Sequence, residues 1–332
     1  MLLDFARKTY VRSAILFCTA LVFLWLKQII FGETIPIERE ESVMPLTDLL
    51  YSFISSPLLE SVYVILITLI SAAILMVIVP KHDLLRGYDY LSAFIFILLS
   101  LSFPIQKQVS GVHLAVLFCL SSLNRLLCIY NRTEKSGNIY LSTLYVGIAG
   151  LFYPPALLFL PIFLISIALL KVFNWRDFFL GISGTITPFI FAASYYHVLG
   201  KDILQPINTI IYFFTPSTSI IDSVRFEEFN IGYLYFGYIA LLIFIATISN
   251  VRGISANIKK SRMLGILRLL IGFLLAAVII FPAMQTPFML TLMAASAAIL
   301  ITSYLSGIRR VKIANIQLIL LIISCILPQF YF

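Results

Sequence analysis

The chain has 332 residues, of which 61% are hydrophobic and 11% are charged, and its mean hydropathy is +1.03. Soluble domains carry about 25% charged residues, so this composition excludes a water-facing globular protein and indicates a polytopic helical membrane protein. We attribute the net charge of +8 to Lys and Arg on the cytoplasmic side of the membrane, and we expect no nucleic-acid partner.

Long apolar runs recur from one end of the chain to the other. A transmembrane helix needs about 20 mostly apolar residues, and the first run shows no signal-peptide cleavage site, so we expect it to be an uncleaved span. The sequence predicts an all-α bundle of about 11 spans that forms a single domain, residues 1–332. The spans are placed at 13–31, 58–79, 88–105, 112–130, 138–153, 154–172, 178–198, 231–248, 263–281, 285–305 and 313–331.

The distribution of charge predicts the orientation of these spans. With the N-terminus inside, all but five of the 23 basic residues fall at cytoplasmic span ends, and two thirds of the 15 acids fall outside. The five exceptions are Lys27, Arg39, Lys107, Lys201 and Arg225. Because basic residues are enriched in cytoplasmic loops, the N-terminus is predicted inside and the C-terminus outside.

Two long outer loops carry the spacing of short amphipathic helices. In the first, about 32–57, Pro45 precedes apolar residues at 46, 49, 50, 53 and 54. In the second, about 200–230, Pro206 precedes apolar residues at 207, 210, 211 and 214. Proline suits the first helical position and this spacing gives one apolar face, so each loop predicts a helix lying in the outer membrane interface.

Four carboxylates in the first outer loop are the candidate catalytic residues: Glu38, Glu40, Glu41 and Asp48. A carboxylate held over a cavity at the membrane surface could act as a general base or bind a divalent cation. The alternative is a solvated acidic loop that enforces the topology, since runs of charge are usually solvated.

A second group of residues could bind the phosphates of a lipid-linked substrate. It consists of Arg225, Lys107, Lys201 and His197. Arg suits bidentate phosphate recognition. The alternatives are an ordinary headgroup anchor and, for Arg225, an ion pair with Glu228 three residues later.

Pro154 and Pro155 interrupt a long apolar stretch. Proline cannot continue a helix, so the break predicts a tight hairpin at the outer face. Both arms are short for a span, so we expect a funnel or thinned region to open there, level with the acidic loop.

Motifs for known chemistries are missing from the sequence. It contains no Gly-rich phosphate loop, no His/Cys metal cluster and no Gly-x-Ser-x-Gly elbow. The four cysteines lie in apolar runs, where they behave as small hydrophobes. We therefore expect neither a metal centre built from His and Cys nor a disulfide framework.

Three motifs resemble those of an uncharacterised polytopic inner-membrane protein family of Bacteroidota. They are Leu123-Asn124-Arg125-Leu126, the segment 150–157 around Pro154-Pro155, and Phe173-Asn174-Trp175-Arg176-Asp177, with Pro188-Phe189 following. The resemblance covers about residues 110–200. It implies a multi-pass protein of the bacterial inner membrane and supplies no catalytic residue, because the family has no assigned activity.

The chain is also similar, more loosely, to C-type membrane glycosyltransferases and O-antigen polymerases. Those proteins have many spans, an acid-bearing first outer loop with interfacial helices and a second large outer loop. The similarity implies that Glu38, Glu40, Glu41 or Asp48 stands where that class places its catalytic acid. The chain departs from the class in having no Asp-Asp or Glu-Asp pair just after the first span.

Three functional hypotheses follow. The first is a glycosyltransferase-like or polymerase-like protein that handles polyprenyl-phosphate-linked saccharides at the outer face. The second is a non-catalytic subunit or scaffold of an envelope-assembly or secretion complex, which would dock other membrane proteins through the small residues 294–298, unless these pack internally. The third is a lipid or small-solute transporter, which would need a midplane site open to both sides.

Overall fold

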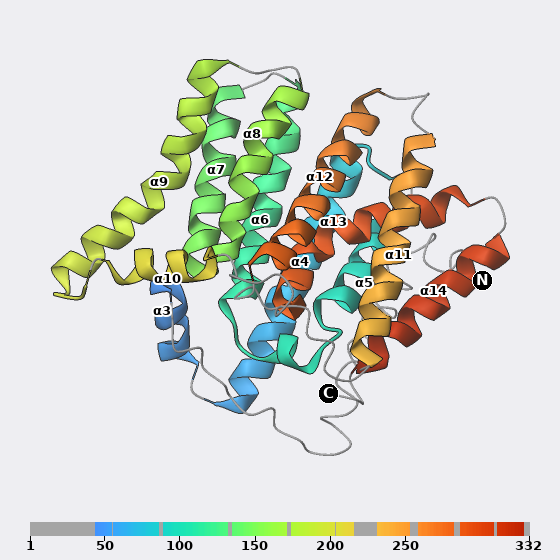
Figure 1. Cartoon of the computed structure of the whole chain (residues 1–332), viewed down its shortest axis with the longest axis horizontal. Coiled ribbons are helices and arrows are strands. Elements are labelled where there is room, and N and C mark those ends of the chain that lie inside the picture. The colour runs from blue at the N-terminus through green and yellow to red at the C-terminus, as the bar shows by residue number, and fades with distance from the viewer. Residues whose placement is uncertain are drawn as a thin grey trace.

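The computed structural model describes residues 44–54, 56–85, 89–131, 135–170, 174–202, 204–215, 231–252, 258–281, 286–308 and 311–328. Within these ranges all regular structure is helical (Figure 1). The α-helices are α3 Pro45–Phe53, α4 Pro57–Lys81, α5 Asp89–Ser100, α6 Gly111–Cys128, α7 Lys135–Phe152, α8 Phe159–Leu169, α9 Trp175–Val198, α10 Gln205–Phe213, α11 Ile231–Arg252, α12 Ile258–Ile280, α13 Thr286–Gly307 and α14 Val311–Ile326. The 3-10 helices are η1 Pro104–Lys107, η2 Ile129–Asn131 and η3 Pro154–Leu158.

The described helices agree with an integral membrane protein. Five are long and apolar enough to cross a membrane: Leu59–Lys81, Gly111–Cys128, Trp175–Val198, Lys260–Ile280 and Phe288–Gly307. Shorter apolar helices cover Tyr90–Ser100, Pro154–Leu169, Gly237–Ser249 and Val311–Ile326. The all-α prediction is confirmed for the described residues, while the count of 11 spans and the orientation stay predictions. The predicted first span, 13–31, lies outside the described residues.

The predicted span 88–105 is shorter than expected. The helix α5 ends at Ser100, and a turn leads into the short 3-10 helix η1. Phe103 has an extended backbone, with φ −101° and ψ 147°, because the ring of Pro104 disfavours the α conformation in the residue before it. The turn at 101–103 is nevertheless buried, so the chain leaves the helical path at Ser100 without becoming exposed.

Two helices, α5 and α13, form the centre of the bundle. Every residue from 91 to 103 and from 288 to 303 is buried, on all faces of both helices. The two helices pack on each other, and α13 also packs on α6, α11 and α12. A helix that is apolar all round is a buried helix. Small side chains on α13 allow this close approach: Ala294, Ala295, Ser296, Ala297 and Ala298 are all buried within the bundle.

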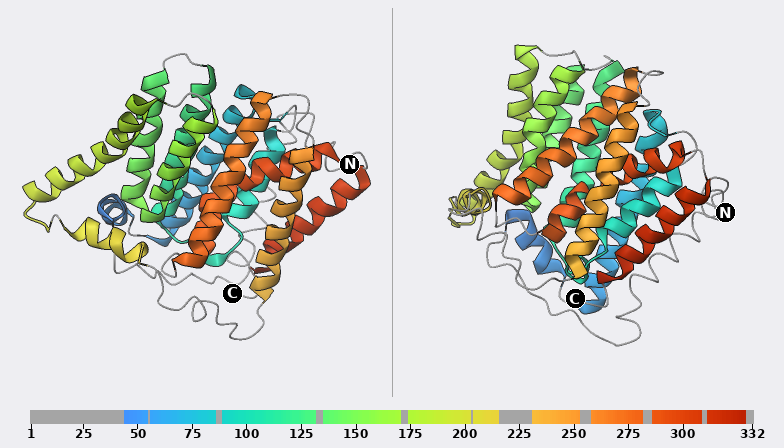
Figure 2. Two further views of the ribbon diagram at one scale, coloured as in Figure 1. Left: turned by 45° about the horizontal axis from the view of Figure 1, so that its top comes forward. Right: turned by 45° about the vertical axis from the view of Figure 1, so that its right-hand side comes forward.

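One end of the bundle gathers several short elements, and we call it the α3 end. Thr47 of α3 donates a hydrogen bond to the carbonyl of Phe152 at 2.7 Å, and Tyr51 donates to the carbonyl of Val109 at 3.2 Å. The helix α3 therefore bridges the end of α7 and the segment between η1 and α6. The helix α10 lies at the same end, below the divergent part of α9 (Figures 1 and 2).

The break at Pro154 and Pro155 also lies at the α3 end. The helix α7 ends at Phe152, Tyr153 is extended, and η3 leads into α8. Both prolines are buried, and the ring of Tyr153 packs edge-on against Phe213 of α10 and Phe288 of α13. Among the described residues, aromatic side chains therefore pack against this hairpin, and the expected funnel or thinned region stays a prediction.

Candidate functional site

The helices α7 and α9 are in close contact over the half that lies away from the α3 end. A Cβ atom at Gly184 of α9 would lie 2.7 Å from the carbonyl oxygen of Tyr140, so only glycine allows this approach. The hydroxyls of Tyr140 and Thr187 are 3.1 Å apart and share a hydrogen bond. In a membrane, small residues and interhelical hydrogen bonds of this kind hold helices together.

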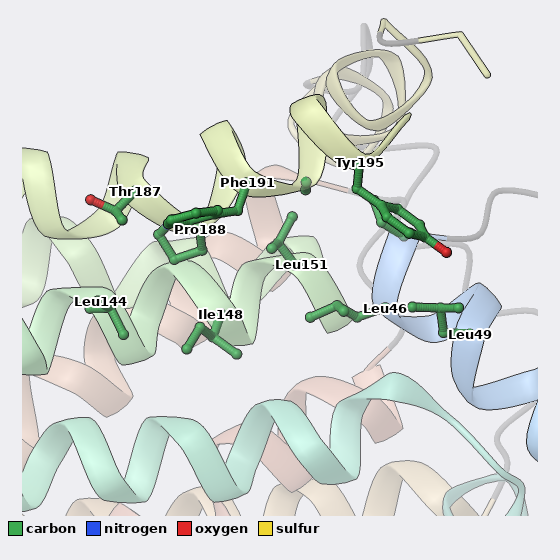
Figure 3. A pocket seen from close by; sticks show the side chains of 11 residues that line it. Leu46, Leu49, Leu144, Ile148, Leu151, Thr187, Pro188, Phe191 and Tyr195 are labelled. Carbon is green, nitrogen blue, oxygen red and sulfur yellow. The ribbon is translucent and has the colours of Figure 1, made fainter. Parts of the chain in front are cut away.

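Beyond this contact, α9 leans away from α7 towards α10 (Figure 1). The change occurs near Pro188, which lies inside α9 and cannot donate the backbone hydrogen bond of a regular helix. A cleft of about 550 Å³ opens between the diverging helices, and α3 forms its end wall (Figure 3). It is lined by Pro45, Leu46 and Leu49 of α3, Leu144, Ile148 and Leu151 of α7, and Thr187, Pro188, Phe191, Ala192 and Tyr195 of α9.

The lining of the cleft is almost entirely hydrocarbon. The hydroxyl of Thr187 is already engaged, because it donates to the carbonyl of Ser183 at 2.8 Å. Tyr195 brings a second hydroxyl, at the α3 end of the cleft (Figure 3). Ile190 and Phe191 of α9 are 60% and 72% exposed, so the rim continues the apolar outer surface of the bundle. The cleft thus opens sideways, towards the surface that lipid would cover.

Local chain geometry places a cation at the α3 end of the cleft. The helix α9 ends in a Schellman motif, in which the N–H of Gly200 bonds to the carbonyl of His197 and the N–H of Lys201 bonds to that of Tyr196, at 3.1 and 3.0 Å. Gly200 has φ +66°, a conformation that glycine adopts without strain. The turn brings the ammonium of Lys201 over the ring of Tyr196, 5.6 Å from its centre.

Lys201 forms an ion pair with Asp48 of α3. Its Nζ donates to Oδ2 of Asp48 at 3.2 Å, across 153 residues of sequence. This hydrogen bond, followed by the charge of Asp48, raises the pKa of Lys201, while desolvation opposes the shift. The two side chains are about half exposed, at 48% and 54%, so the pair is accessible to a ligand. It links α3 to the end of α9, the two elements that border the mouth of the cleft.

The structure brings together two of the eight candidate catalytic and phosphate-binding residues, Asp48 and Lys201. His197 is exposed in the last turn of α9. Lys107 is buried in η1, where it is 5% exposed. The remaining candidates, Glu38, Glu40, Glu41 and Arg225, lie outside the described residues.

Lys107 adjoins a buried polar network that the sequence did not reveal. The side chain of Gln106 accepts from the backbone N–H of Phe103 and donates to Thr291 of α13, both at 2.9 Å. Ser102 also donates to Gln106 at 3.3 Å and accepts from Tyr235 of α11 at 2.6 Å. The network joins η1, α11 and α13, and its groups satisfy one another, which is typical of a structural role.

A second feature missed at the sequence level lies at the end opposite α3. The carboxylate of Asp177, in the first turn of α9, is 3% exposed and pairs closely with the ammonium of Lys135 at the start of α7. The sequence signal for this ion pair was that Asp177 is a lone acid among the basic residues of a predicted cytoplasmic loop. The pair closes the α7–α9 interface at this end.

No cluster of three or more His, Cys, Asp or Glu side chains that could hold a metal ion occurs among the described residues. The four candidate carboxylates were expected to act as a general base or to bind a divalent cation. Asp48 is the one that the structure describes. The cation hypothesis stays a prediction for the three glutamates.

Comparisons with protein-family models, with curated proteins and with solved structures found no match. The resemblances to the Bacteroidota family and to the membrane glycosyltransferases therefore stay predictions.

Proposed function

We propose that the chain is a multi-pass protein of the bacterial inner membrane that binds the hydrocarbon chain of a polyprenyl-phosphate-linked saccharide in the α3–α7–α9 cleft. The observation that carries the proposal is the cleft itself. Its volume of about 550 Å³ lies within the range of about 300–1,000 Å³ typical of ligand sites. We place the α3 end at the outer face, as the charge distribution predicts.

The geometry of the cleft supports a ligand that is apolar along its length and polar at one end. Ile148 and Leu151 offer hydrocarbon contacts, and the Asp48–Lys201 pair follows at the α3 end. Such a ligand can enter from the bilayer without leaving an apolar environment, because the cleft opens sideways. In this arrangement Asp48 is the described candidate for the carboxylate that binds or activates an acceptor hydroxyl.

The other two hypotheses receive less support. The small residues 294–298 offered as a docking face for a scaffold pack inside the bundle. A transporter needs access from both ends, whereas the cleft is closed on one side by the Gly184 contact and the Lys135–Asp177 pair. Neither arrangement favours a second function.

The test is the identity of lipids that remain bound after purification. The protein is extracted in mild detergent, and the retained lipids are identified by mass spectrometry for the wild type and for Ala192→Trp, which fills the cleft. The matched control is Ala73→Trp, on an exposed face of α4. We expect polyprenyl-phosphate-linked saccharides with the wild type and the control, and at least about tenfold less with Ala192→Trp, equivalent to about 1.4 kcal/mol of binding free energy.

A wild-type protein that retains only bulk phospholipids would count against the saccharide assignment. Equal retention by Ala192→Trp and the wild type would remove the cleft as the binding site. Accumulation of lipid-linked saccharides in cells that lack the protein would independently indicate that the protein acts on these lipids.

A further inference from the structure

The ion pair lies beside the mouth of the cleft, next to the lining residues Leu49 and Tyr195, and neither of its two charged side chains lines the cleft itself. The anion, Asp48, stands on α3, and the cation, Lys201, is held by the Schellman turn after α9. Tyr195 lines the cleft, and its neighbour Tyr196 lies beneath the ammonium of Lys201. A headgroup that reaches this mouth therefore meets one donor side and one acceptor side.

The pair is weak enough to be opened by a ligand. Ion pairs between exposed side chains are screened by solvent and contribute little to stability, and both side chains here are about half exposed. A phosphate can replace the carboxylate as the partner of Lys201, since Lys is a common phosphate ligand. Asp48 then needs a new hydrogen-bond donor, because a bare phosphate beside it would be repelled.

We propose that Asp48 and Lys201 form a split headgroup site, in which Lys201 binds the lipid phosphate and Asp48 accepts a hydrogen bond from a hydroxyl of the sugar attached to that phosphate. The inference rests on the proposed function, because the chain in the cleft brings the headgroup to this place. It adds a selection rule. The site favours phosphate that carries a hydrogen-bond donor and disfavours phosphate without one.

The test compares ligands that differ in one feature of the headgroup. Delipidated protein is titrated with a polyprenyl-phosphate-linked monosaccharide, with the polyprenyl phosphate methyl ester and with the free polyprenol, and binding is followed by native mass spectrometry. The wild type should bind the sugar-bearing lipid about tenfold more tightly than the methyl ester. Lys201→Gln should weaken the two phosphate ligands about tenfold and leave polyprenol unchanged. Asp48→Asn should bring the methyl ester within about threefold of the sugar-bearing lipid.

A charge-swapped variant distinguishes a headgroup-binding site from an ion pair that only joins α3 to the end of α9. The variant Asp48→Lys with Lys201→Asp keeps an ion pair but reverses its polarity. If the pair only joins the two elements, the swap will bind all three ligands as the wild type does, and the inference fails. If the pair reads the headgroup, the swap should lose the preference for the sugar-bearing lipid while its melting temperature stays within about 2 °C of the wild type.

The outcomes also distinguish this inference from the proposed function. Suppose that Ala192→Trp abolishes binding of all three ligands, while Lys201→Gln still binds the two phosphate ligands more tightly than polyprenol. The headgroup site is then wrong, and the cleft remains the lipid-binding site. If Ala192→Trp binds polyprenol as well as the wild type does, the cleft itself is wrong. Tighter binding of phosphatidylethanolamine than of the sugar-bearing lipid would overturn the assignment of a sugar hydroxyl to Asp48.

Discussion

The hydroxyl of Thr185 in α9 lies 3.3 Å from the carbonyl oxygen of Thr143 in α7 and equally far from that of Gly181 in its own helix. This shared hydrogen bond lies one turn before Pro188, the residue near which the two helices begin to diverge. The bilayer provides no hydrophobic driving force between helices, so this half of α9 is held by close packing and hydrogen bonds. The other half is left to line the cleft.

The close contact at Gly184 should be sensitive to any side chain. In Gly184→Leu, the new Cβ would lie 2.7 Å from the carbonyl oxygen of Tyr140, and α9 would have to move away from α7. We expect the variant to lose about 1–3 kcal/mol of stability, the usual cost of overpacking, measured as a lower melting temperature in detergent. The control is Gly272→Leu in α12, where a Cβ meets no atom within 4 Å. Equal melting temperatures for the two variants would contradict the prediction.

Removing one partner of the ion pair between Lys135 and Asp177 should lower the stability of the protein. Lys135→Met leaves the carboxylate of Asp177 buried without its cation, and we expect a loss of about 3 kcal/mol. The double variant Lys135→Met with Asp177→Leu removes both charges and should recover most of that loss. Thermal unfolding of the two variants measures the difference. A double variant less stable than the single one would refute this reading.

The contact between Asp48 and Lys201 should be insensitive to pH until the medium is strongly alkaline. The folded protein holds the pKa of Lys201 above its unfolded value of 10.5, so the stabilisation is complete below that value and is lost as pH rises through the folded pKa. The difference in melting temperature between the wild type and Lys201→Gln should therefore be constant from pH 7 to 9 and shrink above pH 10.5. A difference that disappears below pH 9 would point to another group.

The orientation of the bundle can be tested by cysteine labelling. In a variant whose native cysteines are replaced by alanine, Ser52→Cys in α3 and Ser136→Cys in α7 place single thiols at exposed positions of opposite ends. A membrane-impermeant maleimide applied to intact spheroplasts should label Ser52→Cys alone, because the charges predict the α3 end outside. Labelling of Ser136→Cys alone would reverse the orientation.

Helices were predictable because their signals are local. Apolar runs located α6 and α9 to within three residues at their starts, and proline at the first position located the beginnings of α3 and α10 to within one. The same local signals failed at Ser100, where a buried turn is as apolar as a span. Hydropathy reports that a residue avoids water, and a buried turn does so as fully as a helix in lipid.

The cleft was not predictable because it depends on residues far apart in the sequence. Leu46, Ile148 and Phe191 come from three helices and converge only in the folded bundle. Asp48 and Lys201 were both candidates, yet no sequence spacing could show that they meet. The buried proline of α9 was the local signal available, since proline inside a span often marks a change of direction.

The burial of α13 on all sides between 288 and 303 has a consequence for how the protein is assembled. Between 288 and 303 this helix has no face for lipid, because it packs on α5, α6, α11 and α12. Three of these neighbours precede it by at least 34 residues. During synthesis, α5, α6 and α11 are therefore made before the helix that packs between them. The helix inserted late completes the bundle, and chains stopped before residue 286 should be recognised as unassembled and degraded.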